Sequence, residues 1–247
     1  MNNTINNLEP LRAALHKEAV PLAERKAIFF KTQPGEYAAH DQFLGIATPR
    51  LREIAKINHS LPNETVLELL HSPYNEERLL ALFIFIERYQ KGDAACKLQI
   101  YKLYQQHIKQ INNWNLVDAS AHLIVGAELY QKDKQYLLEL AVSDLLWERR
   151  IAIVATWYFI RQNEFDWTIK IAELLLKDKQ DLIHKAVGWM LREMGKRDIT
   201  PLLTFLDTHA HTMPRTMLRY AIEKLNAQSR ALYLAKKVER VDIKKYK

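Results

Sequence analysis

RRIAI, at residues 149–153, opens an expected helix, and similar segments open two others: ERLLA at 77–81 and HKAVG at 184–188. Helix starts are expected near residues 75, 113, 147, 180 and 214, at intervals of 38, 34, 33 and 34 residues. Each interval holds a longer helix and a shorter one. A repeat of this length is typical of stacked helical hairpins, as in HEAT and armadillo arrays, because each pair must bury its apolar face on its neighbours.

The hydrophobic pattern extends this expectation to the whole chain. Apolar residues recur at three- and four-residue spacing, and no alternating stretch competes with them. We therefore expect helices over residues 8–31, 48–58, 62–71, 75–90, 93–109, 113–131, 134–142, 147–162, 166–177, 180–195, 199–208, 214–225 and 228–239. No linker-like segment divides them, which predicts a single α-solenoid domain over residues 1–247, with a short flexible N-terminus (1–7) and a basic C-terminal end (240–247). An irregular helical bundle with accidental spacing is the alternative.

The composition excludes several classes of protein. Only 6 glycines and 8 prolines occur in 247 residues, too few for a many-turned β-sandwich or a glycine-rich phosphate cradle. The single cysteine, Cys96, cannot form an intrachain disulfide. The longest apolar runs, 79–86 and 151–160, are too short to cross a bilayer, and no secretion signal is visible. We expect a cytoplasmic protein without membrane contact, associated with the nucleoid if the source is prokaryotic.

Positive charge is concentrated in the last quarter of the chain. The net charge is +7 overall, whereas residues 185–247 carry 14 basic and 6 acidic side chains. Such a basic region favours a polyanion, because neutralising phosphates releases their condensed counterions. A solvated basic surface is the alternative interpretation.

A solenoid places equivalent helices along one concave wall, so residues one period apart should line up across it. One such row, at intervals of 36, 36 and 35 residues, is Arg78, Trp114, Arg150 and Lys185. One turn further along two of these helices are Asp118 and Trp189. We expect Trp114, Asp118, Arg150 and Trp189 to face a common groove. The alternative is that the tryptophans are core residues and that Arg150 pairs with Asp118. We assign the other tryptophans, Trp147, Trp157 and Trp167, to the core.

Several segments carry a more specific signal. In chain order they are PGEY (34–37), FLGIATP (43–49), NWNLVD (113–118), WERRIAI (147–153), KAVGWMLRE (185–193) and PRTMLRYA (214–221). Together they resemble the AlkD-like DNA alkylation repair family, HEAT-like-repeat glycosylases that act on alkylated purines. Asn115 stands where an aspartate is common in the family, and Asn113 where some members have a second tryptophan.

The resemblance implies a role for each matching residue. Trp114 and Trp189 would flank the deoxyribose of the damaged nucleotide, Asp118 would be the catalytic carboxylate, and Arg150 would hold the DNA backbone. Thr48 and Arg192 resemble positions that touch the backbone, and Lys185 is expected to face a phosphate. The array would wrap duplex DNA in its concave groove, without drawing the base into a tight pocket.

The chemistry of the substrate suits these residue types. Alkylation at N3 or N7 makes a purine cationic and therefore a good leaving group, so positive charge develops on the sugar as the glycosidic bond stretches. A fixed carboxylate and the faces of two indoles stabilise that charge. We expect a monofunctional glycosylase for alkylated purines in double-stranded DNA, acting as a monomer with no cofactor and no metal; the pair His209 and His211 lacks further ligands nearby. The alternative is a non-catalytic HEAT-repeat module that binds structured DNA or a protein partner.

Overall fold

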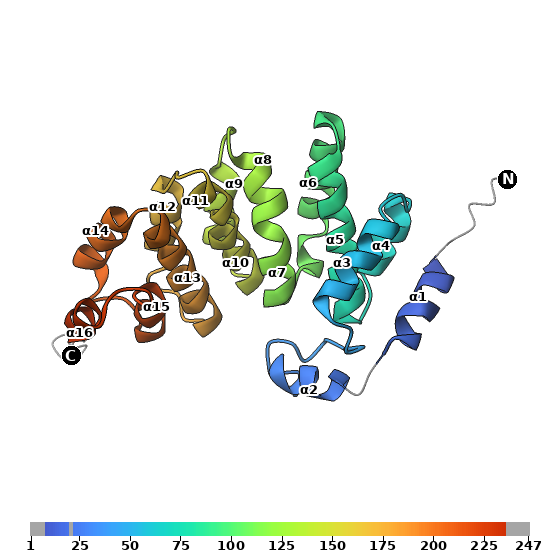
Figure 1. Cartoon of the computed structure of the whole chain (residues 1–247), viewed down its shortest axis with the longest axis horizontal. Helices are drawn as coiled ribbons and strands as arrows, with labels where there is room; N and C mark the ends of the chain where they lie inside the picture. Colours follow the sequence, from blue (N-terminus) through green and yellow to red (C-terminus); the bar gives the residue numbers. More distant parts are fainter. Residues whose placement is uncertain (1–7, 20–21, 236–247) are drawn as a thin grey trace. The chain divides into compact units, whose positions relative to one another are not determined.

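The structure is a computed structural model that describes residues 8–19 and 22–235, and these residues form an all-α, solenoid-like fold (Figure 1). The expected terminal segments 1–7 and 240–247 lie outside the described residues, as does the end of the expected helix 228–239. Contacts divide the chain into two compact units, Met1–Ser120 and Ala121–Lys247. The single domain expected over residues 1–247 stays a prediction, and so does a concave groove that both units would line.

The first unit consists of paired helices that follow one another in the chain. Their bounds are α1 Leu8–Lys17, α2 Leu22–Phe29, α3 Thr48–Ile57, α4 Asn63–Leu70, α5 Asn75–Lys91, α6 Ala94–Gln106, a 3-10 turn at Ile108–Gln110, and α7 Trp114–Ala121. Helix α5 packs against α3, α4 and α6. It is buried over most of its length because the middle of α5 is apolar on every side, from Leu79 to Ile86.

The second unit continues the same pattern. Its elements are a π-helical turn at His122–Gly126, α8 Ala127–Leu129, α9 Gln135–Ala141, α10 Leu146–Ala155, α11 Trp157–Arg161, α12 Asp166–Leu174, α13 Asp181–Arg197, α14 Ile199–His209, α15 Arg215–Ala221 and α16 Ala227–Ala235. Helix α13 packs against α10, α14 and α15. Each of the longer helices therefore contacts its own partner and the next hairpin, as a stacked array requires.

The same hydrogen-bonded turn recurs before three of the longer helices. Ser72, Ser143 and Asp178 each accept, through the side chain, the N–H of the residue two positions later. Six residues after each of them, a side chain of the following helix contacts the main-chain carbonyl of that same residue. The residues that make this second contact are Arg78, Arg149 and His184. The recurrence supports the repeat that the sequence predicts.

These turns correct the predicted row of equivalent residues. Arg78 corresponds to Arg149 and His184, whereas the row had aligned Arg78 with Arg150 and Lys185. The error is one residue, because similar short segments can be aligned in more than one register until the hydrogen bonds are known. Arg78 therefore belongs to the turns between helices rather than to a groove-facing row.

Some expected helices are interrupted. The expected helix 8–31 is two helices, α1 and α2, since a proline at position 21 cannot donate an intrahelical hydrogen bond. The expected helix 147–162 breaks at Thr156, whose hydroxyl donates to the carbonyl of Ile153. The expected helix 113–131 contains the π-helical turn, and a Cβ added at Gly126 would lie 2.2 Å from the Ala155 carbonyl oxygen. Glycine is thus required where this helix meets α10.

Four consecutive polar residues at the start of α5, residues 75–78, are buried and reach different segments. Glu76 accepts the N–H groups of Leu44 and Gly45, each at 3.0 Å. Glu77 accepts from Arg12 Nε at 3.1 Å, and so holds α1. Burying carboxylates is costly unless they are paired, so each of these contacts specifies where its partner segment lies.

Asp41 is the meeting point of the same network. Its side chain is fully buried and forms an ion pair with Arg78. It also accepts from Asn75 Nδ2 at 2.9 Å and from Asn113 Nδ2 at 2.6 Å. Main-chain bonds between Gln42 and residues 73 and 75 strap this loop to the start of α5. One carboxylate thereby joins the loop before α3, the start of α5 and the start of α7.

Within residues 8–19 and 22–235, no helix is both long enough and apolar enough to cross a membrane.

Replacing Asp41 by alanine should lower the free energy of unfolding by about 3–5 kcal/mol, because it leaves the Arg78 guanidinium buried without its counter-ion. Urea denaturation followed by circular dichroism measures the change. Lys91→Ala, which removes the exposed ion pair with Glu87 at 2.8 Å, is the control and should barely shift the midpoint. Equal effects of the two variants would show that Asp41 does not hold the unit together.

Candidate functional site

Trp114 and Asp118 lie on the first turn and a half of α7, whose start is firmly held. The Trp114 N–H donates to Asn113 Oδ1 at 2.7 Å, and Asn113 is bonded in turn to Asp41. Asp118 lies one helical turn after Trp114 and therefore projects from the same face of the helix. Both side chains are partly exposed, in contrast to the fully buried Leu116 and Val117 between them.

The indole of Trp114 is stacked against aromatic rings from two other segments. The Phe30 ring lies 4.9 Å from it at an interplanar angle of 11°. Phe43 stacks on Phe30 at 4.8 Å and 27°. Phe29 meets Trp114 edge-on, with ring centroids 5.8 Å apart. This stack covers one side of the indole with carbon and fixes the plane of its ring.

A hollow of about 330 Å³ adjoins this stack. It contains three of the residues predicted for function, Thr48, Trp114 and Asp118. The other lining residues are Phe30, Phe43, Arg52, Asn75, Glu76, Leu79, Asn115 and Ala119. The hollow therefore combines an aromatic wall with carboxylate and amide groups and one guanidinium.

The buried carboxylate of Glu76 positions the loop before α3. The two hydrogen bonds that Glu76 accepts from the N–H groups of residues 44 and 45 set the path of the chain between Phe43 and Thr48. Thr48 is the first residue of α3 and is exposed. One turn later Arg52 extends over the Phe83 ring, 4.9 Å from its centroid. Arg52 is exposed, so a guanidinium is available to an anion beside the hollow.

The remaining predicted residues lie in the second unit. Arg150, on α10, is 5% exposed, and its Nη1 donates to the main-chain carbonyl of Leu182 in the first turn of α13. This contact connects two neighbouring hairpins. That Arg150 holds the DNA backbone stays a prediction, and its pairing with Asp118 stays the alternative.

Lys185 and Trp189 lie one turn apart on α13. Lys185 Nζ forms an ion pair with Asp181 at 2.8 Å, and this hydrogen bond lowers the pKa of the Asp181 carboxyl. Trp189 is partly exposed, and its Nε1 donates to Glu193 Oε1 at 3.2 Å. Its ring meets that of Trp157 edge-on, with centroids 4.9 Å apart. Trp157, which we had assigned to the core, therefore belongs to the surroundings of Trp189.

Arg192 is engaged by two carboxylates. It forms an ion pair with Glu223 and lies 3.8 Å from Glu193. The hydrogen bond from Lys224 and the charge of Arg192 lower the pKa of the Glu223 carboxyl. A phosphate would have to compete with these carboxylates for the Arg192 guanidinium.

Several residues of the first hollow were missed at the level of the sequence. Phe30, Phe43 and Arg52 belong to segments distant in sequence from Trp114, and only the tertiary structure brings them to the same hollow. Glu76 gave a signal that could have been used: it is a carboxylate in an expected helix start, three residues before an apolar run that begins at residue 79. Such a carboxylate is either exposed to solvent or buried with hydrogen-bond donors from other segments, and Glu76 is buried.

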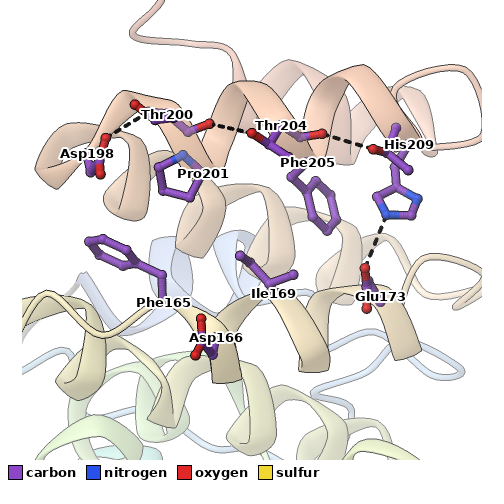
Figure 2. Close-up of a pocket in the computed structure, with 11 residues that line it drawn as sticks. Phe165, Asp166, Ile169, Glu173, Asp198, Thr200, Pro201, Thr204, Phe205 and His209 are labelled. Carbon is purple, nitrogen blue, oxygen red and sulfur yellow. Dashed lines mark hydrogen bonds and ion pairs between the residues drawn. The ribbon is translucent and has the colours of Figure 1, made fainter.

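A second hollow, of about 450 Å³, lies between α12 and α14 and contains none of the predicted residues (Figure 2). Ile169 and Phe205 face each other across it, and Asp166 and Asp198 lie at one end. At the other end His209 Nε2 lies 3.3 Å from Glu173 Oε1. In the described part of the chain, no group of three or more histidine, cysteine or acidic side chains could hold a metal ion.

Two of three comparisons with known proteins give a match. The family model described as "DNA alkylation repair enzyme" matches residues 11–225. A solved structure, described as a predicted DNA alkylation repair enzyme from Enterococcus faecalis, superposes with a TM-score of 0.63 at 16% identity, covering 83% of this chain and 95% of that one. At this identity the likeness shows a shared fold. A comparison with curated proteins gives no match.

Replacing Phe30 by leucine should change the environment of Trp114 while preserving most of the buried apolar volume. The near-ultraviolet circular dichroism of the variant should lose the same band that Trp114→Phe removes, because a stacked ring orients the indole. Loss of stability should stay near 1 kcal/mol. A near-ultraviolet spectrum identical to that of the wild type would show that Phe30 does not orient Trp114.

Proposed function

This chain belongs to the DNA alkylation repair enzyme family, and from that premise we propose that it is a DNA glycosylase for cationic N3- and N7-alkylated purines in duplex DNA. It hydrolyses the N-glycosidic bond and leaves an abasic site. Family membership establishes the coarser statement, a role in DNA repair with DNA as partner. The substrate, the bond that is cleaved and the absence of base flipping belong to the proposal.

The observation that carries the proposal is the hollow in which Trp114 and Asp118 lie together. An indole held flat by a stacked ring and a carboxylate one turn away present π density and negative charge to the same space. Both favour a sugar that becomes cationic as the bond to the base breaks. The Phe30 ring and the hydrogen bonds of Asn113 hold the start of α7 in place before any substrate binds. Little reorganisation is therefore needed in the transition state.

Little acid catalysis is required, since an alkylated purine already carries the positive charge that makes it leave. Asp118 stabilises the positive charge on the sugar and orients the attacking water. The indole face contributes a cation–π interaction of about 0.5–2 kcal/mol. Trp189 supplies a second aromatic face, and Arg150, Lys185, Arg192 and Thr48 contact the DNA backbone without reading sequence.

The proposal extends to the setting of the enzyme. Hydrolysis consumes only water, so no cofactor takes part, and a monomer suffices to present the site. Recognition rests on the lability and charge of the base and on the deformability of damaged DNA. A cytoplasmic location gives access to that DNA in a prokaryotic cell.

The test is incubation of the purified protein with methylated duplex DNA, followed by chromatography of the freed bases. Release of 3-methyladenine or 7-methylguanine supports the proposal. Retained DNA binding without any release under excess enzyme would select a non-catalytic binding module instead.

Asp118→Asn should slow excision under single-turnover conditions by about 100-fold or more, because it removes the negative charge and keeps the shape. Affinity for duplex DNA, measured by fluorescence anisotropy, should change little. Asp166→Asn, at an exposed carboxylate of the second hollow, is the matched control and should excise at the wild-type rate. An undiminished rate in Asp118→Asn would rule out its catalytic role.

Arg150→Ala should weaken DNA binding and reduce the dependence of log K on log salt by about one unit, if the guanidinium neutralises a phosphate. Arg149→Ala is the matched control: the Arg149 guanidinium is itself paired with Asp178 at 2.6 Å, so its removal should leave the slope unchanged. Binding is compared at a temperature where both variants are folded. Equal salt dependence of DNA binding in the two variants would show that Arg150 only joins α10 to α13 and does not contact a phosphate.

A further inference from the structure

The end of α2 exposes two large apolar side chains side by side. Ile28 is 75% exposed and Phe29 is 67% exposed. Among the exposed large hydrophobic side chains that the structure describes, they are the one pair adjacent in sequence. Single exposed apolar residues are ordinary, whereas a contiguous pair beside a site marks a contact surface.

Hydrogen bonds at the end of α2 define the backbone turn that follows the pair. The Lys31 N–H donates to the Ile28 carbonyl, and the Thr32 N–H to the Ala27 carbonyl, each at 3.2 Å. Together with Lys31 at a φ of 57°, these bonds form a Schellman motif. Glycine is usual at that position because a side chain there is strained. The chain carries an exposed lysine at that position.

The same turn adjoins the hollow of Trp114 and Asp118. Phe30 is buried and stacks on Trp114, while the Phe29 ring packs nearly perpendicular to the same indole and remains exposed. Lys31 is exposed on the same turn as this apolar pair, and the exposed Arg52 lines the hollow. Apolar side chains suit sugar and base faces, and the two cations suit phosphates, so the arrangement fits a nucleic-acid strand.

We propose that the turn at the end of α2, residues 28–31, is a DNA-docking element: Ile28 and Phe29 press into the base step beside the damaged nucleotide and unstack it, while Lys31 contacts a phosphate. This inference rests on the proposed function, because it takes DNA as the partner at the site of Trp114 and Asp118. It adds a source of recognition that needs no flipped base. A weakened base step at a lesion yields to such a wedge more easily than intact duplex does.

The test uses a duplex with 2-aminopurine next to a non-cleavable abasic analogue, since 2-aminopurine brightens when it is unstacked. Wild-type protein at saturation should raise the emission, and the double variant Ile28→Ser/Phe29→Ser should lose most of that rise and bind about tenfold more weakly. Ile57→Ser, at a residue 74% exposed on α3, is the matched control and should behave as wild type. A full rise in emission and unchanged affinity in the double variant would overturn the proposal.

Lys31→Gly tests the cation separately. Glycine relieves the strained φ, so this variant should be at least as stable as wild type, and its salt slope for DNA binding should fall by about one unit. An unchanged slope would remove Lys31 from the docking element.

Excision of methylated purines, measured on the same proteins, separates this inference from the proposed function. Unstacking without release of any base would refute the glycosylase and leave the docking element in place. Release of bases by wild-type protein without any rise in emission would refute the wedge alone.

Discussion

A buried carboxylate needs a counter-charge and hydrogen-bond donors, and Asp41 finds them in residues far apart in the sequence. Arg78, Asn75 and Asn113 all bond to it, so the start of α5, the start of α7 and the loop before α3 must meet at one point. Glu76 extends this constraint to the loop that carries Phe43 and Thr48. Two members of this polar network, Asn75 and Glu76, also line the hollow of Trp114 and Asp118.

The two kinds of polar contact in the molecule have different consequences. The recurring turns at Ser72, Ser143 and Asp178 join a side chain to a carbonyl six residues earlier, so each can form within its own hairpin. The network around Asp41 joins distant segments and is found at the hollow. A repeat array can therefore use short-range hydrogen bonds to form its hairpins and a separate network of long-range hydrogen bonds to form its site.

The periodicity of apolar residues predicted most helices closely, as at 48–58 for α3 and 180–195 for α13. Helix formation and turn chemistry are local, so spacing, prolines and capping residues carry that information. Trp114 and Asp118 could be paired in advance for the same reason, because four residues along a helix always share a face. The one-residue error at Arg78 arose where two adjacent arginines made the local pattern ambiguous.

Local sequence thus specified the helices, their repeat and the shared face of Trp114 and Asp118. The tertiary structure decided the rest: the stacking of Phe30 on Trp114, the burial of Glu76 and Arg78, the engagement of Arg150 with the Leu182 carbonyl, and the exposure of Ile28 and Phe29. Each of these depends on which distant segment packs against the residue. An arginine or a phenylalanine has the same helical spacing whether it is buried or exposed, and only its neighbours in space determine which.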